Sequence, residues 1–324
     1  MDEKFIIKKY LKPLANSKDS LQLRDDVACI NVADEKYIVS NQDSLVMGTH
    51  FFESDDPIYI AKKSLRVNLS DLISKGVTPY GYFLSLAMDD TIDENWIKLF
   101  SQGLAEDQKK YNITLLGGDT VSAPHGLFIT INMLSRTNDS IIKRSGACYG
   151  DDIYVTGTIG NSAIGLYLLK NKNDNLGLDQ LDIQKLIRKY HLPDPRLKII
   201  HLIKKFASSS MDTTDGLIND LLVLAGSSGR KFIIKKNLIP YSISAKKFLN
   251  NYGDFDIALY GGDDYEVIFT SPMKFEDKLN EYAKKIKLKI TKIGNVGSVS
   301  KSPRLFDENH TEFKTSYYTF KHFK

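Results

Sequence analysis

Residues 56–76, DPIYIAKKSLRVNLSDLISKG, carry two helical stripes of opposite character. Asp56 before Pro57 is a favourable helix start, and Gly76 is a favourable stop. At helical pitch the first stripe is entirely apolar. Its members are Ile58, Ala61, Leu65, Leu69 and Leu72. The segment therefore predicts an amphipathic helix whose apolar stripe packs on a core.

The second stripe lies beside the first and is polar. Its members are Ser64, Asn68, Asp71 and Lys75. Val67 flanks this stripe on its far side, so we expect Asn68 and Asp71 to be at least half enclosed. An enclosed carboxylate needs a cation or several hydrogen-bond donors, because burying it alone is costly. On this helix alone a solvated polar face is the simpler interpretation, and the choice depends on the other aspartates of the chain.

Composition places the chain among ordinary globular proteins and leaves room for two domains in its 324 residues. Its 44 basic and 40 acidic residues give a net charge of +4, and the lysines are scattered, so a nucleic-acid partner is not indicated. Cys29 and Cys148 have no metal-binding spacing and suggest a reducing compartment. No signal peptide and no apolar run of membrane-spanning length is visible, so we expect a cytoplasmic protein without a membrane partner.

Strand-like and helix-like segments alternate along the chain, which predicts an α/β or α+β protein. Helices are expected over residues 4–15, 56–76, 93–111, 161–169, 217–225 and 274–286. Strands are expected over residues 27–32, 37–40, 44–52, 80–88, 113–116, 127–134, 152–156 and 267–270. The composition shifts to a polar loop around residues 135–150, and we predict a domain boundary there, giving domains 1–144 and 145–324.

Six aspartates occupy positions that suggest a shared acidic site. Asp71 lies on the polar helix stripe, and the others lie at predicted strand edges or beside glycine, namely Asp26, Asp43, Asp119, Asp212 and Asp215. A single aspartate at such a place is usually a turn former or helix cap, but six together favour a common function. Oxygen ligands without cysteine or paired histidine favour magnesium over zinc. Magnesium held by a few carboxylates usually binds substrate phosphates.

These residues therefore predict a magnesium-dependent enzyme that acts on phosphates. No EF-hand, no phosphate-binding loop of the GxxxxGK[ST] type and no protein-kinase motif set is present, so a calcium loop and the common nucleotide-binding folds are not supported. The residues alone leave the substrate open.

Eight short motifs follow one another over almost the whole chain. They are RDDVA (24–28), DSLVMGTHF (43–51), VNLSDL (67–72), LGGDT (116–120), RSGA (144–147), DIYVTG (152–157), DTTDGL (212–217) and GGDDYE (261–266). In this order they resemble the thiamine-monophosphate kinase family, which belongs to the superfamily of aminoimidazole-ribonucleotide synthetase. The resemblance implies a two-domain α/β fold. The N-terminal domain would bind ATP and metal and dimerise through its sheet, and the C-terminal domain would close over the active site.

The resemblance also implies an activity, ATP-dependent phosphorylation of thiamine monophosphate to thiamine diphosphate with several magnesium ions, as the last step of thiamine diphosphate biosynthesis. Family metal positions match Asp26, Asn41, Gln42, Asp43, Asp71, Asp119, Asp212 and Asp215. Nucleotide positions match Tyr111, Gly118, Asp119, Arg144 and Thr214, and substrate positions match His50, Asp263 and Phe320. The acceptor phosphate has a second pKa of about 6 and is largely ionised near neutral pH, so no general base is required. Metals and Arg144 would neutralise the charge between two anions, and transfer would be direct and in line.

Three positions depart from the family pattern. Arg24 replaces the usual glycine, Asn41 and Gln42 replace a Ser/Thr pair, and Asp263 replaces a glutamate. These differences leave two other interpretations open. The chain could be an ATP-dependent enzyme of the same superfamily with another acceptor, or a nucleotide-binding homologue that has lost turnover. His50 and Phe320, taken singly, are more often packing residues than ligand contacts.

Overall fold

The helix predicted over residues 56–76 is present as α2 (Pro57–Ser74) in the computed structural model. This model describes residues 3–19, 30, 32, 36–171, 176–302 and 304–313. The Asp56 carboxylate accepts the backbone N–H of Ile58 at 2.8 Å, and Gly76 leaves the helix at φ +77°. Leu65 and Leu69 are 0% exposed, which confirms the apolar stripe.

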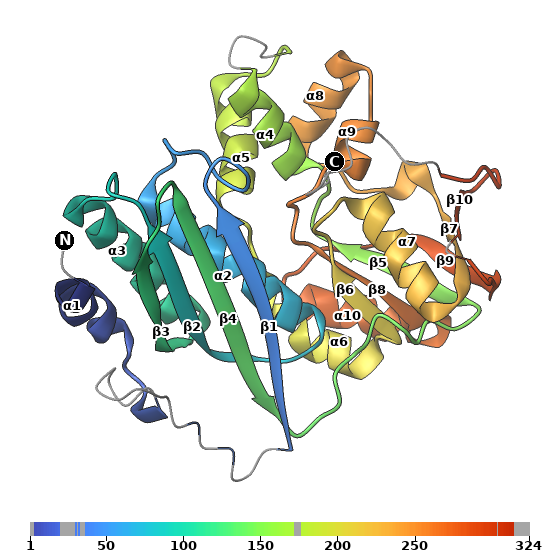
Figure 1. Cartoon of the computed structure of the whole chain (residues 1–324). Helices are drawn as coiled ribbons and strands as arrows, with labels where there is room; N and C mark the ends of the chain where they lie inside the picture. The colour runs from blue at the N-terminus through green and yellow to red at the C-terminus, as the bar shows by residue number, and fades with distance from the viewer. Residues whose placement is uncertain are drawn as a thin grey trace. The chain divides into compact units, whose positions relative to one another are not determined.

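The chain divides into two units. Unit 1 comprises Met1–Ile73 and Val77–Ser140, and unit 2 comprises Ser74–Gly76 and Ile141–Lys324. Each unit has its own β-sheet and its own helices (Figure 1). This mixture of strands and helices in both units confirms the predicted α/β class.

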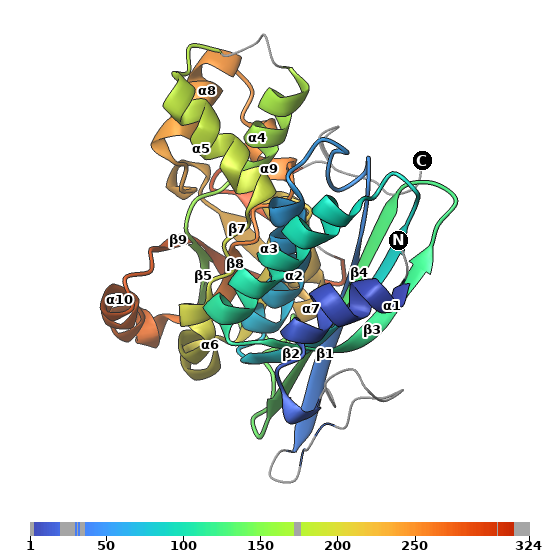
Figure 2. The same ribbon diagram turned by 90° about the vertical axis from the view of Figure 1, so that its left-hand side faces the viewer.

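Unit 1 contains a four-stranded sheet in the order β1-β4-β2-β3. The strands are β1 (Tyr37–Val46), β2 (Pro79–Met88), β3 (Thr114–Ser122) and β4 (Leu127–Thr137). β4 pairs antiparallel with β1 and β2, whereas β2 and β3 are parallel. α2 and α3 (Glu94–Tyr111) cover one face of this sheet (Figures 1 and 2). An added Cβ at Gly103 would overlap the Ile58 carbonyl, so this glycine allows α3 to approach α2 closely.

Two parts of unit 1 differ from the sequence-based expectation. The predicted strands 37–40 and 44–52 are one continuous strand up to Val46, and residues 48–50 form a turn with Gly48 at φ +80°. The helix predicted over residues 4–15 consists of three short pieces, α1 (Glu3–Ile6), η1 (Ile7–Leu11) and η2 (Lys12–Leu14). Pro13 explains the last break, because proline cannot donate the helical hydrogen bond. The predicted strand 27–32 lies outside the described residues except for positions 30 and 32.

Unit 2 contains a six-stranded mixed sheet in the order β10-β7-β9-β5-β8-β6. Its strands are β5 (Asp151–Thr156), β6 (Ser209–Asp212), β7 (Arg230–Ile234), β8 (Val267–Pro272), β9 (Ile290–Val299) and β10 (Arg304–Asp307). Its helices are α4 (Asn161–Lys170), α5 (Gln180–His191), η4 (Leu197–Ile199), α6 (Ile200–Phe206), α7 (Leu217–Ser228), η5 (Lys236–Leu238), α8 (Ile243–Tyr252), α9 (Asp256–Tyr260), η6 (Met273–Phe275) and α10 (Glu276–Lys285). One apolar core joins α7 to the sheet, and a second packs α4, α5 and α8 together. No helix in the described part of the chain is long and apolar enough to cross a membrane.

Candidate functional site

Asn68 is the centre of a hydrogen-bond network that joins α2 to β1 within unit 1. Its side chain is fully buried, and its Oδ1 accepts the backbone N–H of Asp43 and the Nδ2–H of Asn41, both at 3.1 Å. Its own Nδ2 donates to the Ser64 carbonyl at 3.0 Å. Asn41 Nδ2 donates further to Asp71 Oδ2 at 2.9 Å, and Asp71 is partly buried. The expected enclosure of Asn68 and Asp71 is therefore confirmed, and Asn68 fixes the distance between strand and helix.

Asp43 and Asp71 form a pair of neighbouring carboxylates with the properties of a cation site. Burial, and then the negative charge of Asp71, raise the pKa of Asp43 to about 6. The buried Oδ1 of Asn41 has no hydrogen-bond partner among the described residues. Two carboxylates and an amide oxygen are ligands that a hard cation such as magnesium prefers, so these residues fit a magnesium ion.

Gln42 and Asp119 lie on the opposite face of the same sheet. Side chains alternate between faces along a strand, so Gln42 points away from the face that Asp43 shares with α2. In β3, Asp119 pairs with Ser85, which is exposed between the buried Leu84 and Leu86. The structure therefore does not bring Gln42 or Asp119 together with the two carboxylates of their own unit.

Asp26 lies outside the described residues, so its predicted metal role has no structural counterpart here. Among the residues that are described, no group of three or more His, Cys, Asp or Glu side chains is arranged to hold a metal ion. The described acidic cluster of unit 1 is thus the pair Asp43 and Asp71.

Three other predicted residues of unit 1 lie at element ends or tight contacts. An added Cβ at Gly118 would overlap the Leu84 carbonyl, so only glycine fits this parallel pairing. Tyr111 ends α3 and is 3% exposed, with the Arg66 guanidinium 5.9 Å from its ring centre. His50 follows β1, where its Nδ1 accepts the N–H of Val46 at 3.0 Å. Lys63 Nζ donates to the His50 carbonyl at 3.0 Å, which anchors this turn to α2.

In unit 2, β6 delivers Asp212 to a loop that leads into α7. Asp212 and Thr213 are buried, Thr214 is partly buried and Asp215 is exposed. The Asp220 carboxylate, in the first turn of α7, accepts the N–H of Thr214 at 2.9 Å and that of Asp215 at 3.2 Å. Burial, then Asp215, then Asp212 raise the pKa of Asp220 well above its usual value. Asp212 and Asp215 therefore both lie near enough to Asp220 to affect its pKa.

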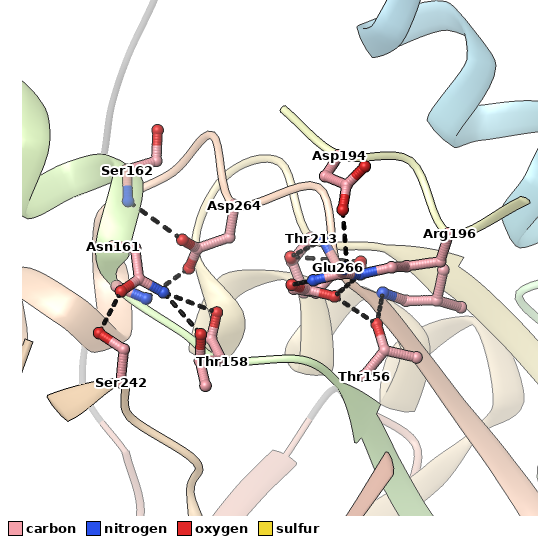
Figure 3. Close-up of polar contacts among 12 residues, drawn as sticks. Thr156, Thr158, Asn161, Ser162, Asp194, Arg196, Thr213, Ser242, Asp264 and Glu266 are labelled. Carbon is pink, nitrogen blue, oxygen red and sulfur yellow. Dashed lines mark hydrogen bonds and ion pairs between the residues drawn. The ribbon is translucent and has the colours of Figure 1, made fainter. Parts of the chain in front are cut away.

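The GGDDYE segment forms a neighbouring loop of unit 2 that carries Asp263. Asp263 has φ +70°, and its Oδ1 accepts the Tyr265 hydroxyl at 3.2 Å. Asp264 points instead to the start of α4, where it accepts the N–H of Gly160 at 2.6 Å and that of Ser162 at 3.3 Å (Figure 3). Burial raises the pKa of Asp264 to about 7, although these two donors oppose the shift.

The last two predicted residues lie apart from these loops or outside the described chain. Arg144 is exposed in the segment before β5, where its carbonyl accepts the Ser228 hydroxyl at 3.1 Å. Phe320 lies outside the described residues.

Sequence reasoning missed the residues that hold the loops of unit 2. Asp220, Asp264, Glu266 and Arg196 each touch these loops or their anchors. Asp220 had a usable signal, an acid in the first turn after Asp215-Gly216. Arg196 had none, because its partner Glu266 lies 70 positions further along the chain.

Comparison with known proteins places these motifs in a family. Residues 24–136 match the family model "AIR synthase related protein, N-terminal domain". Over 310 residues the chain is 36% identical to thiamine-monophosphate kinase of Buchnera aphidicola subsp. Acyrthosiphon pisum, covering 93% of each chain. The crystal structure of thiamine-monophosphate kinase from Stenotrophomonas maltophilia has a TM-score of 0.80 at 30% identity, covering 88% of this chain and 90% of that one.

A second solved structure, described as AaThiL complexed with AMPPCP and TMP, has a TM-score of 0.78 at 28% identity. The match covers 99% of this chain and 95% of that one, so it includes both units. Identity above 30% over nearly the full length of a curated relative identifies the family. This chain belongs to the thiamine-monophosphate kinase family.

Proposed function

We propose that this chain catalyses the ATP-dependent phosphorylation of thiamine monophosphate to thiamine diphosphate. One observation carries the proposal, the match over 99% of the chain to a kinase structure that is complexed with AMPPCP and TMP. The match spans both units, so it supports a function that draws on residues of each.

Magnesium is the metal that the residues of unit 1 fit best. Asp43, Asp71 and Asn41 supply oxygen atoms as ligands, and the pKa of Asp43 is raised by burial and then by the negative charge of Asp71. Asp212 and Asp215 are the corresponding candidates in unit 2. Bound magnesium would neutralise the charge of the phosphates that react.

The remaining chemistry needs positioning more than proton transfer. A phosphate monoester with a second pKa of about 6 is already a nucleophile at neutral pH, so no side chain has to act as a general base. Arg144 offers an exposed cation for the nucleotide phosphates. We therefore propose direct transfer, without a phosphorylated protein intermediate. Acid-stable label on the protein during a single turnover of γ-labelled ATP would exclude this route.

The outward face of the unit 1 sheet supports a homodimer. Four residues at paired positions form an apolar row across the four strands on the face opposite α2. They are Val46, Phe128, Ala87 and Val121. Phe128 is 43% and Val121 49% exposed, which is costly for large apolar side chains on a sheet. We propose that a second copy of the chain covers this face, and Asp119 lies on the same face.

The decisive experiment is turnover of the purified protein with ATP and thiamine monophosphate, with and without magnesium. We expect thiamine diphosphate only when magnesium is present. Thiamine and an aminoimidazole-pathway acceptor serve as alternative substrates. Turnover of one of these in place of thiamine monophosphate would assign a different activity. Nucleotide binding by calorimetry without any product would identify a homologue that has lost turnover.

A further inference from the structure

Two loops of unit 2 are joined by backbone hydrogen bonds, the loop of residues 213–215, here called the nucleotide loop after its predicted role, and the loop of residues 261–266, here called the acceptor loop. The N–H of Asp263 donates to the Thr214 carbonyl at 2.9 Å, and the N–H of Tyr265 donates to the Thr213 carbonyl at 2.8 Å. Thr213 and Glu266 bond to each other twice. The N–H of Thr213 donates to the Glu266 carbonyl at 2.8 Å, and the N–H of Glu266 donates to Thr213 Oγ1 at 3.1 Å. The Asp263 loop therefore has a defined backbone position.

The backbone conformation of this loop is unfavourable at two of its residues, Asp263 and Tyr265. Asp263 has φ +70° and Tyr265 has φ +50°, in the left-handed region that residues other than glycine rarely adopt. Such conformations persist only where the surrounding structure restrains them from several sides. The backbone hydrogen bonds to Thr213 and Thr214 supply part of this restraint, and the anchored side chains of Asp264 and Glu266 supply more.

Glu266 is held by a bidentate ion pair (Figure 3). Arg196 Nε donates to Glu266 Oε2 at 2.7 Å, and its Nη2 contacts Oε1. The Thr156 hydroxyl donates to Oε2 at 2.6 Å. Glu266 is 3% exposed and the Arg196 side chain 17%, so solvent screens this pair little. Asp194 orients the guanidinium from its other side at 2.9 Å.

Gly157 leaves the space that this pair occupies. Its φ is +58°, and an added Cβ would overlap both Glu266 Oε1 and Arg196 Nη2. Glycine is therefore needed after β5 for two reasons, the positive φ of the turn and the space that the ion pair occupies. This close fit indicates that the geometry of the pair, beyond its charge, matters for the loop.

We infer that Arg196 is a positioning residue for the binding of the acceptor substrate. Arg196 acts through Glu266 to hold the Asp263 backbone in its left-handed conformation. This inference rests on the proposed function, because Asp263 is the predicted thiamine monophosphate contact. Arg196 itself need not touch the substrate.

The inference makes a selective claim about the two substrates. The loop of residues 213–215 has its own anchor, since Asp220 accepts the N–H groups of Thr214 and Asp215. Loss of the two-point contact between Arg196 and Glu266 should therefore disturb the acceptor loop more than the nucleotide loop. A purely structural ion pair would affect the binding of both substrates equally or of neither.

Arg196→Lys is the direct test, because lysine keeps the charge but cannot form a two-point contact with the carboxylate. We expect the KM for thiamine monophosphate to rise about tenfold, as small displacements of a binding group are costly. The KM for ATP should change less than about twofold. Glu266→Gln, which keeps one acceptor oxygen, should give the same selective change. Amide hydrogen exchange at residues 262–266 should accelerate in both variants.

Lys247→Gln is the matched control, because it removes an ion pair to the buried Asp182 elsewhere in unit 2. It should lower thermal stability without changing either KM or exchange in the loop. The inference is overturned if Arg196→Lys lowers stability as the control does and leaves both KM values and the loop exchange unchanged. An inactive wild-type protein would refute the proposed function instead. In that case the exchange measurement still decides whether Arg196 holds the loop.

Discussion

At the scale of single residues, Asp43 and Asp71 carry negative charges near each other, and the charge of Asp71 helps to raise the pKa of Asp43. Their mutual repulsion costs folding free energy and creates affinity for a cation. Replacing Asp71 with asparagine keeps an acceptor for Asn41 Nδ2 and removes one charge. The substitution should therefore lower turnover but should not lower the free energy of unfolding.

Asp71→Asn should lower turnover about 100-fold, the usual scale for losing one electrostatic contact in a transition state. Its unfolding free energy without magnesium should be equal to or greater than that of the wild type, since the repulsion is relieved. Steady-state rates at limiting magnesium and urea unfolding in chelator measure the two effects. Full activity of the variant at limiting magnesium would remove Asp71 from the metal site.

Asp264 gives a prediction for pH dependence. Its pKa is raised from 3.8 to about 7 in the folded chain, so the folded state binds this proton more tightly than the unfolded state. The stabilising contribution is complete below about pH 4, declines as the pH rises to 7, and is constant above that. Asp264→Asn should therefore gain stability relative to the wild type over this range, by at most about 1.4 kcal/mol for each pH unit.

Denaturant unfolding between pH 4.5 and 8 checks this slope. Asp307→Asn is the control of opposite sign, because the backbone N–H of Thr311 holds the pKa of Asp307 below its usual value. That variant should lose stability relative to the wild type at neutral pH and approach it as the pH falls. Parallel curves for Asp264→Asn and the wild type would contradict the assigned burial of the carboxylate.

The site was partly visible at the residue scale. Asn68 and Asp71 could be placed from helical spacing alone, because the polar stripe and the apolar stripe beside it lie within one segment. Asp43 followed from its place at the edge of a predicted strand, and the family motif added its metal role. Asp264 and Glu266 belong to a recognised motif as well, but their partners Gly160 and Arg196 are distant in sequence. A contact between distant segments leaves no local pattern, so these anchors needed the fold.

At the scale of elements, several buried helices and strands were predicted well, whereas polar parts of strands and the strands β6, β7 and β9 were not. α2, α3, α4 and β5 each begin or end within about two residues of the predicted limits, which is the usual uncertainty of element ends. β1 was divided in two because Asn41, Gln42 and Asp43 are poor strand formers. Its ten residues pair in register with β4 all the same, so tertiary pairing outweighs local propensity.

β3 supplies a prediction of its own, since it continues through Gly117-Gly118-Asp119, beyond the predicted strand end at Leu116. An alanine at position 118 would overlap the Leu84 backbone, whereas one at position 117 meets only the movable Phe83 ring. Gly118→Ala should cost about 1–3 kcal/mol of unfolding free energy, as overpacking does. Gly117→Ala should cost clearly less. Equal losses, measured by denaturant unfolding, would show that the parallel pair can move apart.

At the scale of the whole molecule, the apolar row on the unit 1 sheet predicts the oligomeric state. Sedimentation of the wild type at micromolar concentration should give a dimer. Phe128→Glu places a charge within the row and should give a monomer at the same concentration, because an unpaired charge is costly to bury. Val223→Glu, at a residue of equal exposure in unit 2, should leave the dimer intact. A monomeric wild type, or a dimeric Phe128→Glu variant, would refute the proposed interface.

The alternation of β1 also constrains how this chain can change in length. Asn41 and Asp43 face α2, and Gln42 and Ser44 face outward, so each residue's face is set by whether its position is odd or even. Inserting or deleting one residue before Asn41 would turn both site residues away from Asp71, whereas a change of two residues would preserve them. Relatives with a working site should therefore differ here by even numbers of residues, and odd differences should be confined to loops such as 138–145.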